Sequence, residues 1–326
     1  MHHFINRSII CISLVLRLIF NADVHAAPLP SELMVDYADY NPLSLVLKKF
    51  NWLDEEFRAD HVRIHWVYSP ASDVALNNLQ TDSLDVASSA SFSSVWSRAV
   101  GEPIKVVYVF ARAEWHSLVV SRDSPIKSVK ELKGRKIAVT VGTRPYYFLL
   151  LALREAGMHK GDVEIIPMSH EDGRAAMEQN FVDAWADGNP YVAMSQLERG
   201  SRVIYRNVLF NSNGVLNVKE DFGRKYPDVV SRVIKTYERA RNWAIRHPDD
   251  LEMIFAEEAR LPLSLSRQVL SRFDFSRPVF DKNDIRLQRE AVSVLKDEKL
   301  IPKDTDIDKV IDDLIDPVIS ARVGCP

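Results

Sequence analysis

Short apolar segments with strand character alternate with segments of helical spacing over most of this 326-residue chain. The first predicted pair is a strand at Leu33–Val35 and a helix at Leu43–Asn51, with Asn41 at a cap position and Pro42 in the first turn. The alternation continues to a predicted strand at Val215–Val218, and beyond it only helical spacing remains. Strands and helices that alternate in this way build an α/β fold. The sequence therefore predicts the α/β class with a helical tail.

The N-terminal segment has the pattern of a secretory signal. Ser8–Phe20 is a short apolar run after the basic Arg7, and Val24-His25-Ala26 follows as a small-residue cleavage site. The run is too short to span a bilayer, which takes about 20 apolar residues. We expect residues 1–26 to be removed and the mature protein to act outside the cytoplasmic membrane. The alternative for the same residues is a buried N-terminal helix.

Composition and motifs exclude several classes of function. The net charge is −3, so no basic surplus indicates a nucleic-acid partner. Cys11 lies in the leader, which leaves Cys325 as the single thiol of the mature chain and rules out an intramolecular disulfide and a multi-cysteine metal site. The histidines show no metal-ligand spacing, and the chain has no nucleophile elbow, phosphate loop or dinucleotide-binding glycine motif. We therefore expect no catalytic residue, no metal and no cofactor.

Three predicted strands end in short polar turns that lead directly into helices. The turns are Asp39–Pro42, Ser88–Ser91 and Gly142–Pro145. Unpaired N–H groups at the start of a helix favour anions, and ligands of open α/β sheets collect beyond the carboxyl ends of the strands. Convergence of the turns would therefore make an anion-binding cleft, and the alternative is three ordinary capped helices. The aromatic residues expected near such a cleft are Tyr40, Trp115, Tyr146, Tyr147 and Tyr191.

Several segments between residues 84 and 191 carry a family resemblance. In chain order they are Leu84–Ser89, Ala99–Gly101, Ser124–Val139, Gly142-Thr143 with Leu149–Gly157, Asp172–Met177, and Val182–Trp185 with Asn189–Tyr191. In order and spacing these segments resemble periplasmic solute-binding proteins of sulfonate, taurine and nitrate importers, and they are nearest to the aliphatic-sulfonate-binding proteins. The resemblance runs from Leu33 to Leu209 and extends loosely into the helical tail.

This resemblance implies a type II periplasmic-binding-protein fold, in which two lobes joined by a two-stranded hinge close over a solute. The expected crossings lie near Ser121–Ser124 and Asn211–Gly214. The expected division is 1–26 as signal peptide, 27–121 and 214–326 as the first lobe, and 122–213 as the second lobe. The resemblance also implies a monomeric, periplasmic component of an ABC importer. Such a component delivers a small-molecule solute to an inner-membrane permease with its ATPase and binds no nucleic acid.

The turns and the resemblance together indicate a set of ligand-binding residues. They are Asp39, Tyr40, Asn41, Ser89, Ala90, Ser91, Trp115, Thr143, Arg144, Tyr146, Asp187 and Asn189. Arg144 suits a sulfonate or carboxylate, because a guanidinium fork binds such anions. Asp39 and Asp187 would oppose an anion by their negative charge. The sequence therefore predicts an organosulfonate as the solute and leaves open a neutral or cationic solute, such as an amine or a pyrimidine.

Two further functions stand as alternatives. Pyrimidine-forming enzymes of thiamine synthesis share the implied fold and resemble this chain distantly, but they rely on a cysteine-rich motif that a chain with Cys325 alone lacks. A sensory protein would use the same fold to present its bound solute to a receptor.

Overall fold

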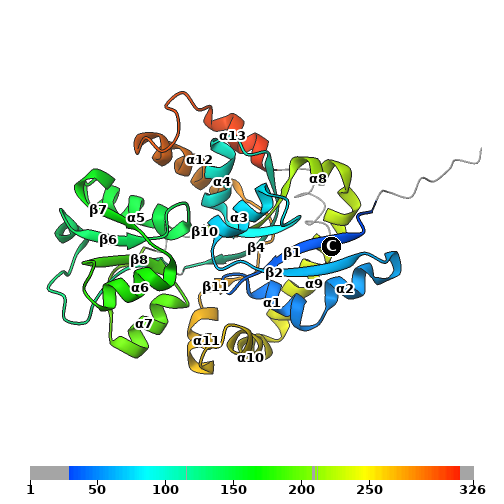
Figure 1. The fold of residues 1–326 in the computed structure, drawn as a ribbon, viewed down its shortest axis with the longest axis horizontal. Coiled ribbons are helices and arrows are strands. Elements are labelled where there is room, and N and C mark those ends of the chain that lie inside the picture. Colours follow the sequence, from blue (N-terminus) through cyan, green and yellow to red (C-terminus); the bar gives the residue numbers. More distant parts are fainter. Residues whose placement is uncertain (1–28, 115, 208–209, 211, 316–326) are drawn as a thin grey trace, which may run out of the picture.

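The computed structural model describes residues 29–114, 116–207, 210 and 212–315, which form two lobes of mixed strand and helix. We call residues 29–113 and 212–315 the first lobe and residues 116–207 the second lobe. Figure 1 shows the second lobe on the left and the first lobe on the right. The predicted α/β class and two-lobed architecture are confirmed. The predicted signal peptide, 1–26, lies outside the described residues.

Two sheets form the strand framework of the first lobe. The parallel pair consists of β1 (Glu32–Tyr37) and β2 (Arg63–Tyr68). The other sheet has the order β11-β4-β10-β3, with β3 (Ala87–Ala90), β4 (Ile104–Ala113), β10 (Ser212–Lys219) and β11 (Phe273–Asp274). A bridge between Val35 and Val86 joins β1 to the segment that leads into β3, so the two sheets are linked.

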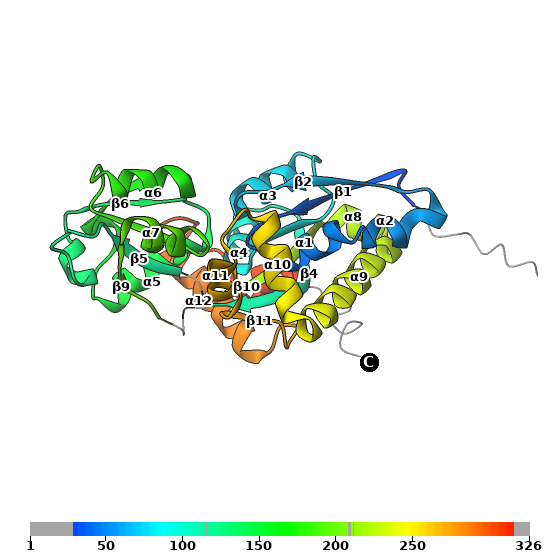
Figure 2. The ribbon, with the colours of Figure 1, turned by 90° about the horizontal axis from the view of Figure 1, so that it is seen from below.

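The helices of the first lobe cover both sheets, and the long α9 runs across the lobe in Figure 2. Their bounds are α1 (Pro42–Lys49), α2 (Trp52–Phe57), η1 (Arg58–Asp60), α3 (Ser72–Gln80), α4 (Ser91–Ala99), α8 (Glu220–Lys225), α9 (Pro227–Arg246), α10 (Pro248–Glu258), α11 (Leu263–Leu270), α12 (Lys282–Asp297) and α13 (Ile307–Leu314). The predicted start of α1 is confirmed: Asn41 Oδ1 accepts a hydrogen bond from the Ser44 N–H at 3.3 Å, and Pro42 begins the helix.

The second lobe is a five-stranded sheet covered by helices. The sheet order is β7-β6-β8-β5-β9, with β5 (His116–Val120), β6 (Lys136–Val139), β7 (Glu164–Pro167), β8 (Ala184–Gly188) and β9 (Arg202–Tyr205). The helices are η2 (Val129–Leu132), α5 (Arg144–Glu155), η3 (Lys160–Asp162), α6 (His170–Glu178) and α7 (Tyr191–Arg199). In the part of the chain that the structure describes, no helix has both the length and the apolarity needed to cross a bilayer.

The chain passes between the lobes after β4 and again after β9. The sequence predicts the first crossing near Ser121–Ser124, but His116–Val120 forms β5, which pairs with β8 and β9 of the second lobe. We therefore propose that the chain leaves the first lobe after β4 and enters the second at β5. We propose the lobe bounds given above in place of a boundary at residue 121.

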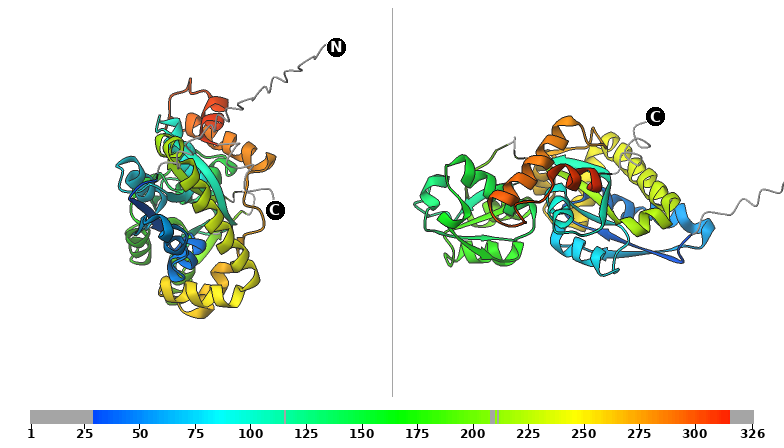
Figure 3. Two further views of the ribbon diagram at one scale, coloured as in Figure 1. Left: turned by 90° about the vertical axis from the view of Figure 1, so that its right-hand side faces the viewer. Right: turned by 90° about the horizontal axis from the view of Figure 1, so that it is seen from above.

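Aromatic stacking across the lobe junction fixes the start of α5 beside α4. The Phe92 and Tyr147 rings stack at 4.3 Å between centroids, and the Trp96 and Tyr146 rings stack at 5.8 Å. The C-terminal α12 contacts both α4 and α5. The right-hand view of Figure 3 shows α12, in orange, beside this junction. Tyr146 and Tyr147, two of the aromatic residues expected near the cleft, therefore pack the junction.

Polar side chains form the short strand β3, where the sequence predicts a turn at Ser88–Ser91. Ser88 donates from its N–H and its hydroxyl to Asp36, at 2.9 and 2.8 Å. Asn217 of β10 donates to Ser89 Oγ at 2.9 Å. Burial raises the pKa of Asp36 to about 7, although the hydrogen bonds from Ser88 oppose this rise. A fully buried acid thus holds β3 and positions its last residues between the lobes.

Candidate functional site

A cavity of about 60 Å³, which we call the cleft, lies between the two lobes. Residues of each of the three predicted turns line it. The predicted residues among its walls are Asp39, Tyr40, Ser89, Ala90, Thr143, Arg144, Asp187 and Asn189. The turns therefore converge on one cavity, as the anion-cleft hypothesis requires. That these residues bind a ligand stays a prediction.

Several helices begin at the cleft. The residues at or next to their starts that line it are Ser72 of α3, Ala90 before α4, Arg144 of α5, His170 of α6 and Tyr191 of α7. Each helix start presents N–H groups without intrahelical partners and a partial positive charge. Their convergence favours a negatively charged group in the cleft.

Arg144 places a buried positive charge in the wall of the cleft. Its residue surface is 5% exposed, and its Nε has no hydrogen-bond partner. Its guanidinium makes no ion pair with any acidic residue that the structure describes, and it lies 5.2 Å from the centroid of the Tyr147 ring. Burial lowers the pKa of Arg144 to about 9, so the group is charged at neutral pH. A buried charge without a partner is costly, and a bound anion would remove that cost.

His170 and Asp187 form a buried pair beside Arg144. His170 Nδ1 lies 2.7 Å from Asp187 Oδ2, and its ring stacks on Tyr191 at 5.3 Å. Burial lowers the pKa of His170, but the charge and hydrogen bond of Asp187, with smaller contributions from nearby acids, outweigh burial and raise this pKa above its usual value. Asp187 Oδ1 also accepts from the Gly188 N–H at 2.6 Å. The negative charge of Asp187 is therefore compensated within the protein.

His116 is the other histidine in the wall of the cleft. Burial lowers the pKa of His116 well below its usual value, and the positive charges of Arg144 and His170 lower it further. The ring is therefore neutral at physiological pH. One of its nitrogens donates a hydrogen bond and the other accepts.

A wider hollow of about 660 Å³ adjoins the cleft, and we call it the mouth. The two share Pro70, Ala71, His170 and Tyr191. The mouth is also lined by Asp73, whose buried Oδ1 has no partner, and by the exposed Glu171.

Asp39 lines the cleft, and its Oδ2 accepts a hydrogen bond at 2.9 Å from the hydroxyl of Tyr68, which lines the mouth. Burial raises the pKa of Asp39, while the bond from Tyr68 opposes the rise. The mouth is therefore acidic, whereas the inner end of the cleft carries Arg144.

Three predicted residues do not line the cleft. Asn41 caps α1 and donates from Nδ2 to the Tyr237 hydroxyl at 3.3 Å. Ser91 is buried within α4, and Tyr146 stacks on Trp96. Trp115 lies outside the described residues. Thr143 does line the cleft, but its hydroxyl donates to the Thr140 carbonyl and does not cap α5.

The sequence reasoning missed His116, His170 and the segment Pro70–Ser72, all of which line the cleft. A signal for His170 was available, because Pro167–His170 leads from β7 into α6 just as the three chosen turns lead from strands into helices. His116 begins β5, and the stretch from β4 into β5 reads as ordinary strand, so nothing local marks it. Within the described residues, no three His, Cys, Asp or Glu side chains form a group that could hold a metal ion.

Comparisons with known proteins agree with this geometry. The sequence model described as NMT1/THI5 like matches residues 61–251, which is more than half of the chain. The chain is 28% identical over 290 residues to a protein of Escherichia coli strain K12 that is provisionally named an aliphatic sulfonates-binding protein. That match covers 87% of this chain and 89% of the relative.

Solved structures with the same fold include two sulfonate-binding proteins. The periplasmic aliphatic sulphonate binding protein SsuA of Escherichia coli superposes with a TM-score of 0.72 at 25% identity, over 86% of this chain and 97% of that one. The alkanesulfonate-binding protein SsuA of Xanthomonas axonopodis, bound to MOPS, gives a TM-score of 0.79 at 21% identity, over 87% and 99%. The predicted periplasmic-binding-protein fold is therefore confirmed.

Proposed function

The chain belongs to the NMT1/THI5-like family, and from this premise we propose that it is the extracytoplasmic solute-binding component of an ABC importer. We propose further that its solute is an organosulfonate, captured in the cleft between the lobes. The sulfonate-binding names of its relative and of its structural neighbours support this substrate class. We also propose that it acts in the periplasm and docks on an inner-membrane permease with its ATPase. The names of the same relatives support this role.

The unpartnered guanidinium of Arg144 is the observation that carries the proposal. A sulfonate presents three oxygens with shared negative charge, and the planar fork of an arginine binds two such oxygens at once. The helix starts at Ala90 and Thr143 add backbone N–H groups without a further formal charge. A sulfonate at this position would compensate a charge that the protein leaves unpaired.

The electrostatics of the cleft orient the solute. Asp187 does not repel the sulfonate, because His170 compensates its charge. Asp73 and Glu171 make the mouth unfavourable for an anionic group, and Asp39, in the cleft wall beside Tyr68, adds to this effect. The sulfonate therefore lies at the inner end, and the two lobes close over the solute by motion about the crossings after β4 and β9.

Binding explains the cleft better than catalysis does. Nucleophilic catalysis by a serine or threonine hydroxyl needs a neighbouring base that activates it. The Ser89 hydroxyl contacts Ser94 Oγ at 2.8 Å, and the Thr143 hydroxyl donates to a carbonyl. Among the described cleft residues, neither hydroxyl is bonded to His116 or His170. Neither the Ser89 nor the Thr143 hydroxyl is therefore activated by a histidine of the cleft, which supports a binding role.

A cationic solute is the second candidate, and the acidic mouth favours it. Asp73 Oδ1 is buried without a partner, and the exposed Glu171 lies beside it in the wall of the mouth. An amine bound between these carboxylates and the faces of Tyr68 and Tyr191 would be stabilised by charge and by cation–π contact. Such a solute would leave Arg144 without a partner.

Isothermal titration calorimetry with matched ligands separates the two candidates. We expect ethanesulfonate to bind at least about 30-fold more tightly than ethylamine, because a buried charge pair contributes about 2 kcal/mol or more. Nitrate, taurine and a pyrimidine complete the panel. Tighter binding of ethylamine would favour the second candidate and contradict the first. If no member of the panel binds, both candidates are wrong.

A further inference from the structure

A second chamber of about 560 Å³ adjoins the cleft, and we call it the rear chamber. Arg144 and Asn213 line both the cleft and the rear chamber, so the two cavities meet at these residues. The cleft itself offers about 60 Å³. A solute held in the cleft can therefore extend toward the mouth or toward the rear chamber, since each shares wall residues with the cleft.

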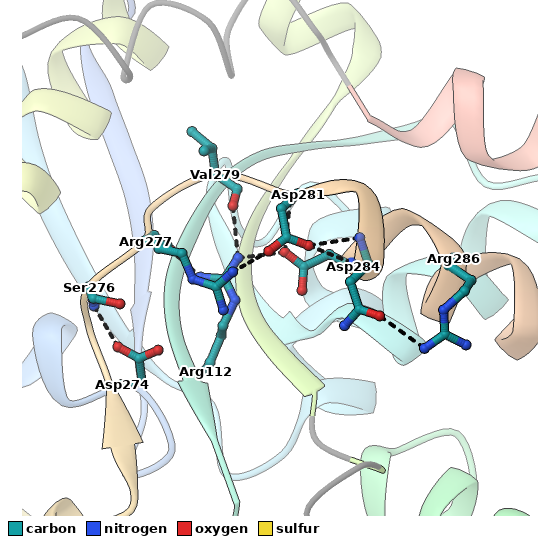
Figure 4. A network of polar contacts seen from close by, with 9 residues as sticks. Arg112, Asp274, Ser276, Arg277, Val279, Asp281, Asp284 and Arg286 are labelled. Carbon is teal, nitrogen blue, oxygen red and sulfur yellow. Dashed lines mark hydrogen bonds and ion pairs between the residues drawn. The ribbon is translucent and has the colours of Figure 1, made fainter.

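Most charged groups around the rear chamber already have partners. Figure 4 shows Arg112 reaching from β4 to the loop that precedes α12. Arg112 donates to Asp284 Oδ2 at 2.5 Å, to the Val279 carbonyl at 2.8 Å and to the Arg277 carbonyl. Arg277 in turn pairs with Asp281. These groups form a closed network that holds the start of α12.

Two further arginines, Arg286 and Arg206, pair with residues around the rear chamber. Arg286 donates to Asn283 Oδ1 at 2.9 Å and lies 3.6 Å from Glu290. Glu114 accepts from Arg206 at 2.6 Å. Glu114, Asp284 and Glu290 are therefore engaged by neighbouring arginines, whereas Asp274, the other acid of the wall, accepts a hydrogen bond from the Ser276 N–H at 2.8 Å.

Arg272 is different, because its side chain makes no hydrogen bond or ion pair with any residue that the structure describes. It is half-buried in the chamber wall, next to Arg206 and Glu114. Burial lowers the pKa of Arg272, and the positive charge of Arg206 lowers it further. The chamber thus has an unpaired guanidinium at Arg272, and it shares a second one, Arg144, with the cleft.

We propose that the rear chamber binds a second anionic group of the same solute, a carboxylate or a second sulfonate, through Arg272. This inference rests on the proposed function, because it takes the first sulfonate to lie at Arg144. The acidic mouth repels a second negative charge, whereas the rear chamber offers a cation without a partner. The solute class is accordingly an organosulfonate with a second anionic group at the far end of its carbon chain.

Calorimetry on the purified protein tests this with ligand pairs of equal chain length. The pairs are 1-propanesulfonate with 3-sulfopropanoate and 1-hexanesulfonate with 6-sulfohexanoate. We expect the carboxylated member of at least one pair to bind about tenfold or more tightly than its partner, as a hydrogen bond between charged groups requires. The advantage should be lost in Arg272→Gln and kept in Arg272→Lys. It should also be kept in Arg286→Gln, a matched control whose side chain is 64% exposed in the wall of the same chamber.

The outcomes separate the two proposals. If plain alkanesulfonates bind and no carboxylated partner binds more tightly, the inference is wrong and the proposed function stands. The same conclusion follows if the tighter binding of the carboxylated ligand persists in Arg272→Gln with unchanged thermal unfolding. A third outcome is that acetate, titrated in saturating 1-propanesulfonate, binds only when Arg272 is present while the carboxylated ligands show no advantage. The chamber then binds a separate anion, and the inference that it binds a second group of the same solute is wrong. If no sulfonate binds, both proposals fail.

Discussion

Replacing Arg144 with methionine is expected to weaken ethanesulfonate binding by at least about 30-fold and to make the solute-free protein more stable. Arg144 is 5% exposed as a residue and its guanidinium pairs with no acidic residue that the structure describes, so the folded protein bears the cost of its desolvation. Methionine fills similar space without a charge. We expect the free energy of unfolding to rise by about 1 kcal/mol. Calorimetry and urea unfolding measure the two effects on the same samples.

Arg154→Met is the matched control for this prediction. Arg154 belongs to the same helix, α5, but its side chain is 53% exposed and lies 3.4 Å from Asp297 on the surface. Its replacement should change neither affinity nor unfolding by more than about 0.5 kcal/mol. Unchanged ethanesulfonate affinity in Arg144→Met would show that this guanidinium does not hold the sulfonate.

Asp187→Asn is expected to destabilise the protein by about 3 kcal/mol at pH 5.5, and by less at pH 9. The substitution leaves His170 buried without its counter-charge. In the folded protein the pKa of His170 is raised above 6.5, so its contribution to stability is fully present below about pH 6.5 and is lost as the pH rises through the folded pKa. Without Asp187, burial lowers this pKa instead. Urea unfolding at the two pH values, with NMR titration of His170, measures both changes.

Glu171→Gln serves as the control for Asp187→Asn. Glu171 also contributes to the raised pKa of His170, but it is exposed and makes no hydrogen bond to the ring. We expect it to cost less than about 0.5 kcal/mol at either pH. An Asp187→Asn deficit of equal size at pH 5.5 and pH 9 would contradict the charge pairing.

Local sequence signals predicted the elements well where chain neighbours decide the structure. Asn41 and Pro42 mark the start of α1, and the predicted α7 has the bounds Tyr191–Arg199 that the structure shows. The strand β3 was missed because its stability comes from distant residues. Its serines bond to Asp36 and to Asn217, and polar side chains without those partners read as a turn.

Contacts between residues that are distant in the chain also limit how much of the site can be predicted from the sequence. The three turns lie in the chain where helices begin, so their polar residues could be chosen from sequence alone. The sequence assigned Asp187 an unfavourable charge, because nothing in it shows that His170 lies 2.7 Å away. The lobe boundary that we propose after β4 differs from the one that the sequence suggests near residue 121 for a related reason. His116–Val120 is apolar enough for either lobe, and only its pairing with β8 and β9 assigns it to the second.

A crystal structure of the protein grown with ethanesulfonate tests the central claim most directly. We expect the sulfonate oxygens within about 3 Å of the Arg144 guanidinium and of N–H groups at the starts of α4 and α5. A sulfonate located in the mouth beside Tyr68 and Glu171, with Arg144 still unpaired, would contradict the account.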